Sequence, residues 1–139
     1  LEEFLLCYPD RTLLHVGKGF IDAPNFKSLG FIEDMDTLRA EIQSAKVALS
    51  QLGLKRIGMT EATPLKHVDY VACGLPIISG AVDTLLDGAY PIYYLQTEDV
   101  KNLEEIIVNI ENTSQELSSE NLEERVSLYE EQFFLVCNS

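Results

Sequence analysis

One stretch in the middle of the chain, residues 66–79, most constrains the fold that this sequence can adopt. Thr63 and Pro64 are typical of a helix start, because threonine can cap the first turn and proline lacks an N–H that would stay unpaired there. Gly74 is typical of a left-handed helix C-cap, and Pro76 prevents the helix from continuing. The apolar run that follows is too short for a helix, so the stretch predicts a short helix and then a buried strand.

The rest of the chain alternates between strand-like and helix-like patterns. Strands are predicted at 12–16, 26–31, 46–52, 77–79 and 92–95. Helices are predicted at 1–8, 33–45 and 98–110 and from about residue 120, with a helical turn at 82–86. Strands separated in this way by helices or loops indicate a parallel sheet covered on both faces. We therefore expect an α/β fold, a Rossmann-like parallel sheet of about five strands with helices on both faces.

Length and charge narrow the function classes. A chain of 139 residues is long enough for a single domain, 1–139, with a hydrophobic core. Its net charge of −13 argues against nucleic acid and anionic membrane surfaces as partners. Residues 98–139 hold 11 of the 23 acidic residues and only two basic ones, so the remainder is less acidic and could still bind an anion. No stretch has the roughly 20 apolar residues of a transmembrane helix.

The three cysteines, Cys7, Cys73 and Cys137, form no metal-binding spacing. An odd and scattered set predicts reduced, buried thiols in a cytoplasmic protein rather than a disulfide framework. No signal peptide opens the sequence. Because the chain starts at Leu1 within a helical pattern, we expect it to be a fragment of a longer protein.

Three segments are expected at the carboxyl ends of strands, where open parallel sheets bind ligands. They are the turn Gly17-Lys18-Gly19, the loop 53–62 and the helix start near Pro64. Together they could hold one anionic ligand. The alternative for the glycine turn is a plain exit from the strand.

The helix start offers two backbone amides, those of Leu65 and Lys66, which have no partner within the helix and could meet an anion. The alternative is that the Thr63 hydroxyl occupies one of them. Farther along, the carboxylate of Asp69 could accept two hydrogen bonds from the vicinal hydroxyls of a sugar. Its alternative role is a surface ion pair with Lys66, one turn earlier, worth a few tenths of a kcal/mol.

The remaining chemistry-bearing residues give weaker indications. His15 and His67 are expected to be structural or exposed, and no Cys–His or Ser–His arrangement stands out in the sequence. No catalytic residue can therefore be assigned from the sequence.

The central stretch resembles the "K-x-x-E-Y-x-A-x-G-x-P-V-I" motif of GT-B glycosyltransferases, particularly the retaining family 4 type. The flanking segments resemble the same family in order: Leu13 to Gly19, Leu29 to Phe31 and Ala45 to Leu49. The matching residues are Lys66, Asp69, Tyr70, Ala72, Gly74, Pro76, Ile77 and Ile78. The resemblance covers nearly the whole chain as the C-terminal, donor-binding half of such an enzyme.

This resemblance implies a nucleotide-sugar donor, a hexosyl-type transfer to an unknown acceptor, and no bound metal or other cofactor. The N-terminal acceptor domain of the family is missing from this chain, so the fragment alone is expected to be inactive. In the family, two acids eight positions apart serve the donor, and Glu61 and Asp69 match that spacing. Glu61 and Lys66 are then expected near the sugar and phosphates, and Asp69 near the ribose.

The chain departs from the family in two places. Asp69 is one methylene shorter than the usual glutamate, and Ala62-Thr63-Pro64 replaces the usual Gly-Phe-Gly. These departures leave room for a non-catalytic, glycosyltransferase-like module that binds other proteins. A flavodoxin-like or receiver-like domain would also fit the strand count, but it leaves the 66–79 match unexplained.

Overall fold

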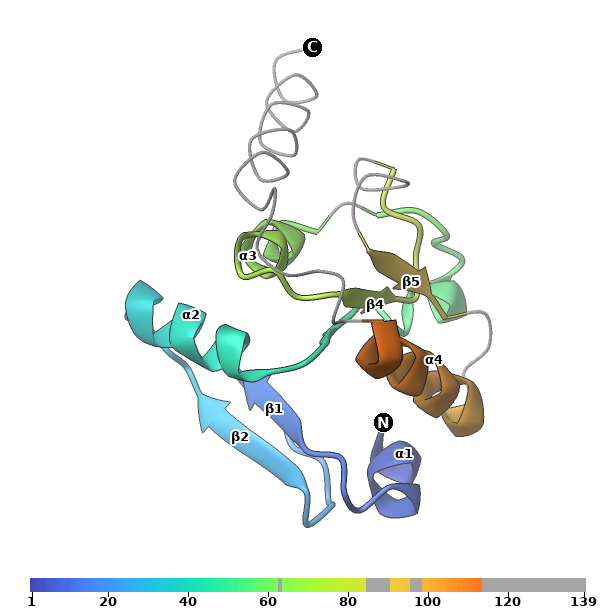
Figure 1. The fold of residues 1–139 in the computed structure, drawn as a ribbon, viewed down its shortest axis with the longest axis horizontal. Helices are drawn as coiled ribbons and strands as arrows, with labels where there is room; N and C mark the ends of the chain where they lie inside the picture. The colour runs from blue at the N-terminus through green and yellow to red at the C-terminus, as the bar shows by residue number, and fades with distance from the viewer. Residues whose placement is uncertain (63, 85–90, 96–98, 114–139) are drawn as a thin grey trace.

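The computed structural model of this chain describes residues 1–62, 64–84, 91–95 and 99–113. Strands and helices alternate along these residues (Figure 1). The elements are α1 (Glu2–Cys7), β1 (Leu13–Val16), β2 (Phe26–Gly30), α2 (Met35–Ser44), β3 (Ala48–Ser50), the 3₁₀ helix η1 (Leu54–Ile57), α3 (Lys66–Ala72), β4 (Ile77–Ser79), β5 (Ile92–Tyr94) and α4 (Val100–Thr113).

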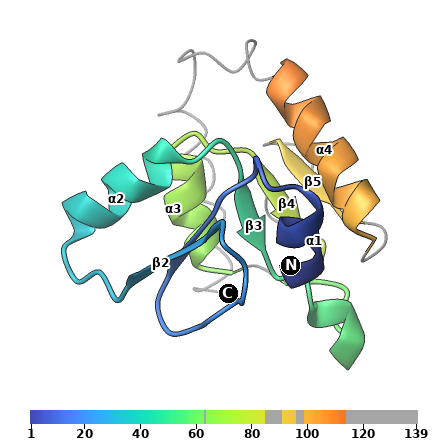
Figure 2. The same ribbon diagram turned by 90° about the horizontal axis from the view of Figure 1, so that it is seen from below.

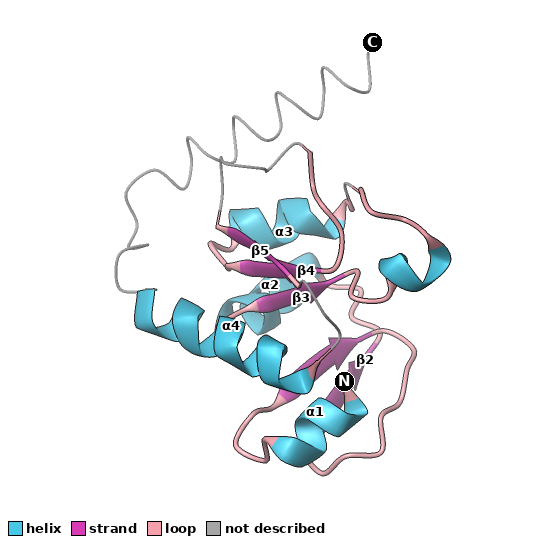
Figure 3. Ribbon diagram, turned by 90° about the vertical axis from the view of Figure 1, so that its right-hand side faces the viewer, coloured by secondary structure: helices cyan, strands magenta, loops and turns pink. Residues whose placement is uncertain are grey.

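The strands form two parallel sheets (Figure 3). β1 pairs with β2, and β3, β4 and β5 form a second sheet with β4 in the centre. The α/β class and the parallel pairing are thus confirmed, whereas a single sheet of five strands is not what the described residues form. No strand pairing among the described residues joins β1 or β2 to β3, β4 or β5, so the strands divide into two sheets.

β4 lies at the centre of the hydrophobic core. Ile77 and Ile78 are both 0% exposed, and because successive strand residues point to opposite faces, they enter different clusters. Ile78 packs with residues of α1 and α4, and Ile77 with residues of α3. The three-stranded sheet is therefore the middle of three layers, with α4 on one side and α3 on the other (Figure 2).

The C-terminal end of α3 has the geometry that the sequence predicts. Gly74 has φ +71°, and its N–H donates to the carbonyl of Val71 at 3.0 Å. The N–H of Leu75 donates to the carbonyl of Tyr70, also at 3.0 Å, which completes a Schellman motif. The chain then leads directly into β4, as predicted.

The N-terminal end of α3 differs from the prediction. The helix begins at Lys66, Leu65 is its N-cap residue, and no side chain of a described residue caps it. The Pro64 carbonyl accepts from the His67 N–H at 3.0 Å, so a tighter turn precedes the helix. Thr63 lies outside the described residues.

Other boundaries shift by a few residues. α2 begins two residues later than predicted, because Asp34 caps it and accepts from the Thr37 hydroxyl and from the Thr37 N–H, the latter at 2.8 Å; the bond from the hydroxyl and, after it, the bond from the N–H lower the pKa of Asp34. The predicted strand 46–52 shortens to β3, and the predicted loop 53–62 contains η1. The final helix from about residue 120 lies outside the described residues, as do the last two residues of the turn predicted at 82–86.

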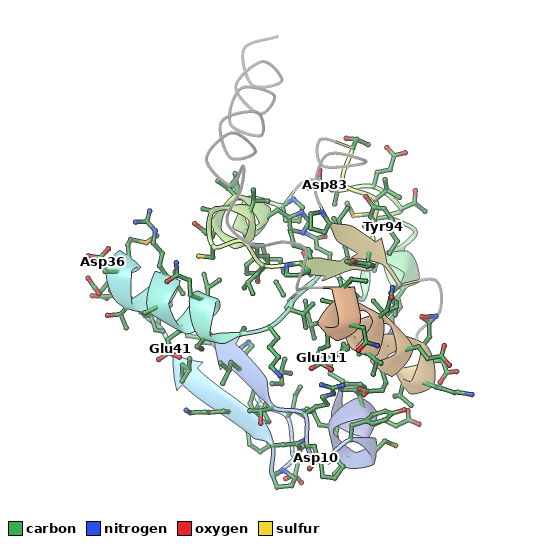
Figure 4. The ribbon with its side chains drawn as sticks, viewed as in Figure 1. Asp10, Asp36, Glu41, Asp83, Tyr94 and Glu111 are labelled. Atoms are coloured by element: carbon green, nitrogen blue, oxygen red, sulfur yellow. The ribbon has the colours of Figure 1, made fainter. Side chains whose placement is uncertain are left out.

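A cluster of charged side chains attaches the start of β1 to α4. The Arg11 guanidinium contacts the carboxylates of Glu104 and Glu111, each at 2.7 Å. Figure 4 shows Glu111 on α4. Hydrogen bonding to Arg11 lowers the pKa of Glu111 and is the largest cause of that shift. Since α4 also packs on the three-stranded sheet, this cluster connects the two sheets through one helix.

Candidate functional site

The loops that follow β3 and β4 are joined at the carboxyl edge of the three-stranded sheet. The loop after β3 returns as residues 60–62 and pairs in parallel with Val82, which follows β4. The Val82 N–H donates to the Thr60 carbonyl at 2.8 Å, and the Ala62 N–H donates to the Val82 carbonyl at 2.9 Å. Val82 was expected in a helical turn, and that prediction is wrong because its backbone is engaged by this pairing.

Gly80 allows the two loops to approach closely. Its N–H donates to the Ser50 carbonyl at 3.1 Å, and a Cβ at this position would lie 2.5 Å from the Gln51 carbonyl oxygen. Gln51 itself has φ +54°, a left-handed conformation that is uncommon outside glycine. The chain therefore turns sharply at the end of β3 and passes in close contact with Gly80, the residue after β4.

A chain of buried polar side chains lies beneath these loops. His67 Nδ1 is 2.6 Å from Asp83 Oδ2, and His67 Nε2 is 2.7 Å from Ser50 Oγ. All three residues are at most 1% exposed, and Figure 4 shows Asp83 beside α3. With the Asp83 carboxylate accepting from Nδ1–H, a neutral imidazole leaves Nε2 free to accept from the Ser50 hydroxyl.

This arrangement has the connectivity of a Ser–His–Asp relay, in which the carboxylate orients the imidazole and the imidazole activates the hydroxyl. A nucleophile must also reach its substrate, and Ser50 is only 1% exposed. Because Ser50 is buried, the three side chains can stabilise the structure but cannot attack an external substrate.

This chain of side chains is not predicted from the sequence, in which no Ser–His arrangement stands out. Its members are 16 and 17 positions apart, and no local spacing brings them together. One signal was present: Ser50 and Asp83 each follow two apolar residues. A polar residue that continues a buried apolar segment is expected to have a buried partner.

Four of the predicted site residues lie on α3 or in the loop before it. Glu61 is exposed beside Val82, Leu65 and Lys66 are exposed at the helix start, and Asp69 is half-buried. Desolvation by surrounding protein lowers the pKa of Lys66, although the residue as a whole is exposed.

The surface ion pair proposed between Lys66 and Asp69 is absent from the described residues. Asp69 is close enough to Tyr70 and Cys73 that its charge contributes to raising their pKa values, after desolvation as the larger cause.

The glycine turn after β1 belongs to the other sheet. Gly17 has φ +111°, and its N–H donates to the Gly30 carbonyl at 2.7 Å. A Cβ on Gly19 would lie 2.9 Å from Cε1 of His15, so the turn packs against that ring. Lys18 is exposed. Within the described part of the chain, no hydrogen bond or ion pair joins residues 17–19 to Glu61 or Lys66.

The described residues contain neither a metal-binding cluster nor a membrane-spanning helix. No group of three or more histidine, cysteine or acidic side chains there could hold a metal ion. None of the helices described is both long and apolar enough to cross a membrane. Cys7 and Cys73 are free thiols; Cys7 is exposed and Cys73 half-buried, so the expectation that these thiols are buried is wrong. Cys137 lies outside the described residues.

Comparison with known proteins adds no relative to this picture. Neither models of protein families, nor curated proteins, nor solved structures gave a match to the chain. The resemblance to family 4 glycosyltransferases therefore rests on the sequence pattern of residues 66–79 and its flanks.

Proposed function

We propose that this chain is the donor-binding domain of a glycosyltransferase and binds a nucleotide-sugar at the carboxyl edge of β3 and β4. The observation that carries the proposal is the position of Glu61 and Lys66. Both are exposed at that edge, on segments tied to the ends of two adjacent parallel strands. Open parallel sheets bind their ligands at this edge.

The roles of the residues follow from their chemistry. The Lys66 ammonium suits the diphosphate, and the Leu65 and Lys66 amides, which have no hydrogen-bond partner among the described residues, can donate to its oxygens. The Asp69 carboxylate can accept from the ribose hydroxyls, and Glu61 from the sugar. Gly17, Lys18 and Gly19 would flank the donor if the two sheets act as halves of one Rossmann-like arrangement.

In this proposal the acceptor is bound by a further domain, so the present chain binds donor but transfers nothing. We expect weak binding, with a Kd on the order of 1 mM for UDP-glucose or GDP-mannose. Isothermal titration calorimetry of the 139-residue chain tests this. Absence of heat with both nucleotide-sugars at millimolar concentration would refute the proposal.

A paired substitution tests the assignment of the site. Glu61→Ala with Asp69→Ala should abolish the heat of binding. Glu105→Ala with Asp36→Ala, which removes two exposed acids from α4 and α2, is the matched control and should leave binding unchanged. Equal binding by both double variants would show that the donor, if bound, lies elsewhere.

A second candidate is a non-catalytic module that binds another protein. Phe20 and Phe31 follow the neighbouring strands β1 and β2 and are 81% and 79% exposed, which is unusual for so large an apolar side chain. Phe20→Ser with Phe31→Ser should leave nucleotide-sugar binding intact if the first proposal holds. Transfer activity in the longer protein would decide against a purely non-catalytic role.

A further inference from the structure

We propose that His67 is a positioning residue for the ligand site: by bonding to Ser50 and Asp83, it holds Glu61 and Lys66 in a fixed relative placement. The inference rests on the proposed function for what the site binds. It goes beyond that function in assigning a role to three residues that would not touch the ligand.

The three polar groups are almost completely buried. His67 and Asp83 are 0% exposed and Ser50 is 1% exposed. Removing such groups from water is unfavourable unless each hydrogen bond is regained inside the protein, so a buried polar chain adds little net stability compared with apolar packing. Such a chain instead restricts its members to one geometry, since any displacement leaves a buried group without its partner.

The three residues come from three different segments of the polypeptide. Ser50 is the last residue of β3, His67 lies in the first turn of α3, and Asp83 follows β4. His67 thus joins three separate segments at the carboxyl edge of the sheet. Its contacts measure 2.6 Å and 2.7 Å, which leaves little room for one segment to slide past another.

Each of the exposed residues Glu61 and Lys66 lies next to one of the three buried polar residues or to its sequence neighbour. Lys66 directly precedes His67, and Glu61 pairs with Val82, which directly precedes Asp83. The hydrogen bonds of the neighbouring buried residues therefore fix the backbone at each of these two site residues. A shift of His67 changes the spacing between an acidic and a basic group on the surface above it.

A matched pair of serines isolates this role. Ser79 is the register partner of Ser50 in the neighbouring strand and is equally buried, at 1% exposed. Among the described residues its hydroxyl bonds within its own loop, donating to the Ala81 carbonyl at 2.7 Å and accepting from the Ala81 N–H at 3.2 Å. Ser50→Ala removes a hydrogen bond to His67. Ser79→Ala removes an equally buried hydroxyl and leaves the hydrogen bonds of His67 in place.

The experiment is amide hydrogen exchange on the whole chain, read by mass spectrometry, with UDP-glucose calorimetry in parallel. Ser50→Ala should speed exchange at least about fivefold at the hydrogen-bonded amides of residues 62, 67–68 and 82 together, the change expected for one lost hydrogen bond. It should also weaken UDP-glucose binding by a similar factor. Ser79→Ala should change exchange only within residues 80–82 and should leave the Kd unchanged.

Two further variants of His67 keep the test decisive. His67→Leu should produce the same joint loosening more strongly, and His67→Asn, whose side-chain amide can still donate to Asp83, should restore part of the protection. If His67→Leu does not fold, Asp83→Asn takes its place, because it keeps the shape and removes the charge. Loosening confined to one segment in Ser50→Ala, or equal effects of the two serine substitutions, would overturn the proposal.

The two proposals fail separately. If the wild-type chain gives no heat with UDP-glucose but Ser50→Ala still loosens the three segments together, the donor proposal fails and the positional coupling stands without that ligand. If UDP-glucose binds but exchange and Kd are unaffected by Ser50→Ala, the donor proposal stands and His67 has no positioning role.

Discussion

The two sheets of this protein are built from similar short parallel strands but are held in different ways. The sheet of β3, β4 and β5 has helices on both faces and a central strand that is 0% exposed at both isoleucines. The sheet of β1 and β2 is half-buried or exposed along its length, and Val16, at the end of β1, is 39% exposed. The three-stranded sheet can keep the side chains of Ser50, His67 and Asp83 buried at its edge because helices cover both of its faces. At a water-exposed edge, water would hydrate such polar groups.

The difference extends to the loops at the carboxyl ends. After β3 and β4 the backbones touch at Gly80, and the loops are joined by hydrogen bonds. After β1 the glycine turn packs against a histidine ring, and Phe20 and Phe31 are exposed. The loops of the three-stranded sheet are therefore better suited to hold polar groups in a fixed geometry. The exposed phenylalanines after β1 and β2 are better suited to apolar contacts with a partner.

Truncation of the central strand should give the largest difference between the sheets. Ile78→Ala should lower the free energy of unfolding by about 3–5 kcal/mol, because it leaves a cavity between α1, α4 and the sheet. Leu29→Ala in β2, at a half-buried position, should lower it by less than about 2 kcal/mol. Urea denaturation followed by circular dichroism measures both. Equal losses would mean that the two sheets are equally well packed.

Alanine substitutions at three glycines should separate the two loop regions. Gly80→Ala should lower the free energy of unfolding by about 2 kcal/mol or more, because its Cβ meets backbone at 2.5 Å and at 2.7 Å. Gly19→Ala should be milder, since the clash at 2.9 Å is with a side-chain ring that can move.

Gly53→Ala is the control for these two. Apart from its chain neighbours, the described residues place nothing within 4 Å of a Cβ at this position, so the change should be neutral or stabilise by up to about 1 kcal/mol. Thermal unfolding of the three variants gives the ranking, and a tolerant Gly80 would contradict the close approach of the loops after β3 and β4.

Removal of Arg11 should loosen the two-stranded sheet from α4. Arg11→Met removes the guanidinium that bridges Glu104 and Glu111, although Lys46 still lies 3.6 Å from Glu111, and should cost about 1–2 kcal/mol, between the values for exposed and buried pairs. Lys101→Met, which breaks an exposed pair with Glu105 at 4.0 Å, should cost only a few tenths of a kcal/mol. Hydrogen exchange should rise in β1 and β2 but not in β4, and a rise spread over both sheets would argue against separate attachment.

The smallest effect is expected from pH. Because Arg11 lowers the pKa of Glu111 in the folded protein, the unfolded chain takes up a proton at higher pH than the folded one. The stabilisation is present above the ordinary glutamate pKa and is lost as pH falls through the lower, folded value. Urea midpoints between pH 6 and pH 3 should therefore fall less steeply in Arg11→Met than in the wild type. Parallel curves would show that Glu111 does not contribute.

Much of the local structure could be predicted from sequence because its causes are local. The Schellman end of α3 follows from Gly74 and Pro76, and the strand after it follows from an apolar run too short for a helix. The start of α3 was less predictable, since its helical hydrogen bonds begin only after the turn at Pro64. The prediction of a helical turn at Val82 is wrong for a different reason: the backbone of Val82 pairs with Glu61, 21 residues earlier in the chain.

The sequence by itself determined the α/β class, the parallel pairing and the order of elements, since these depend on short-range patterns of apolar residues, glycine and proline. Only the tertiary structure decided that five strands divide between two sheets and that Ser50, His67 and Asp83 meet beneath the candidate site. Strand pairing and buried hydrogen bonds join residues that are distant in the chain, and their energies depend on burial, which no local spacing encodes.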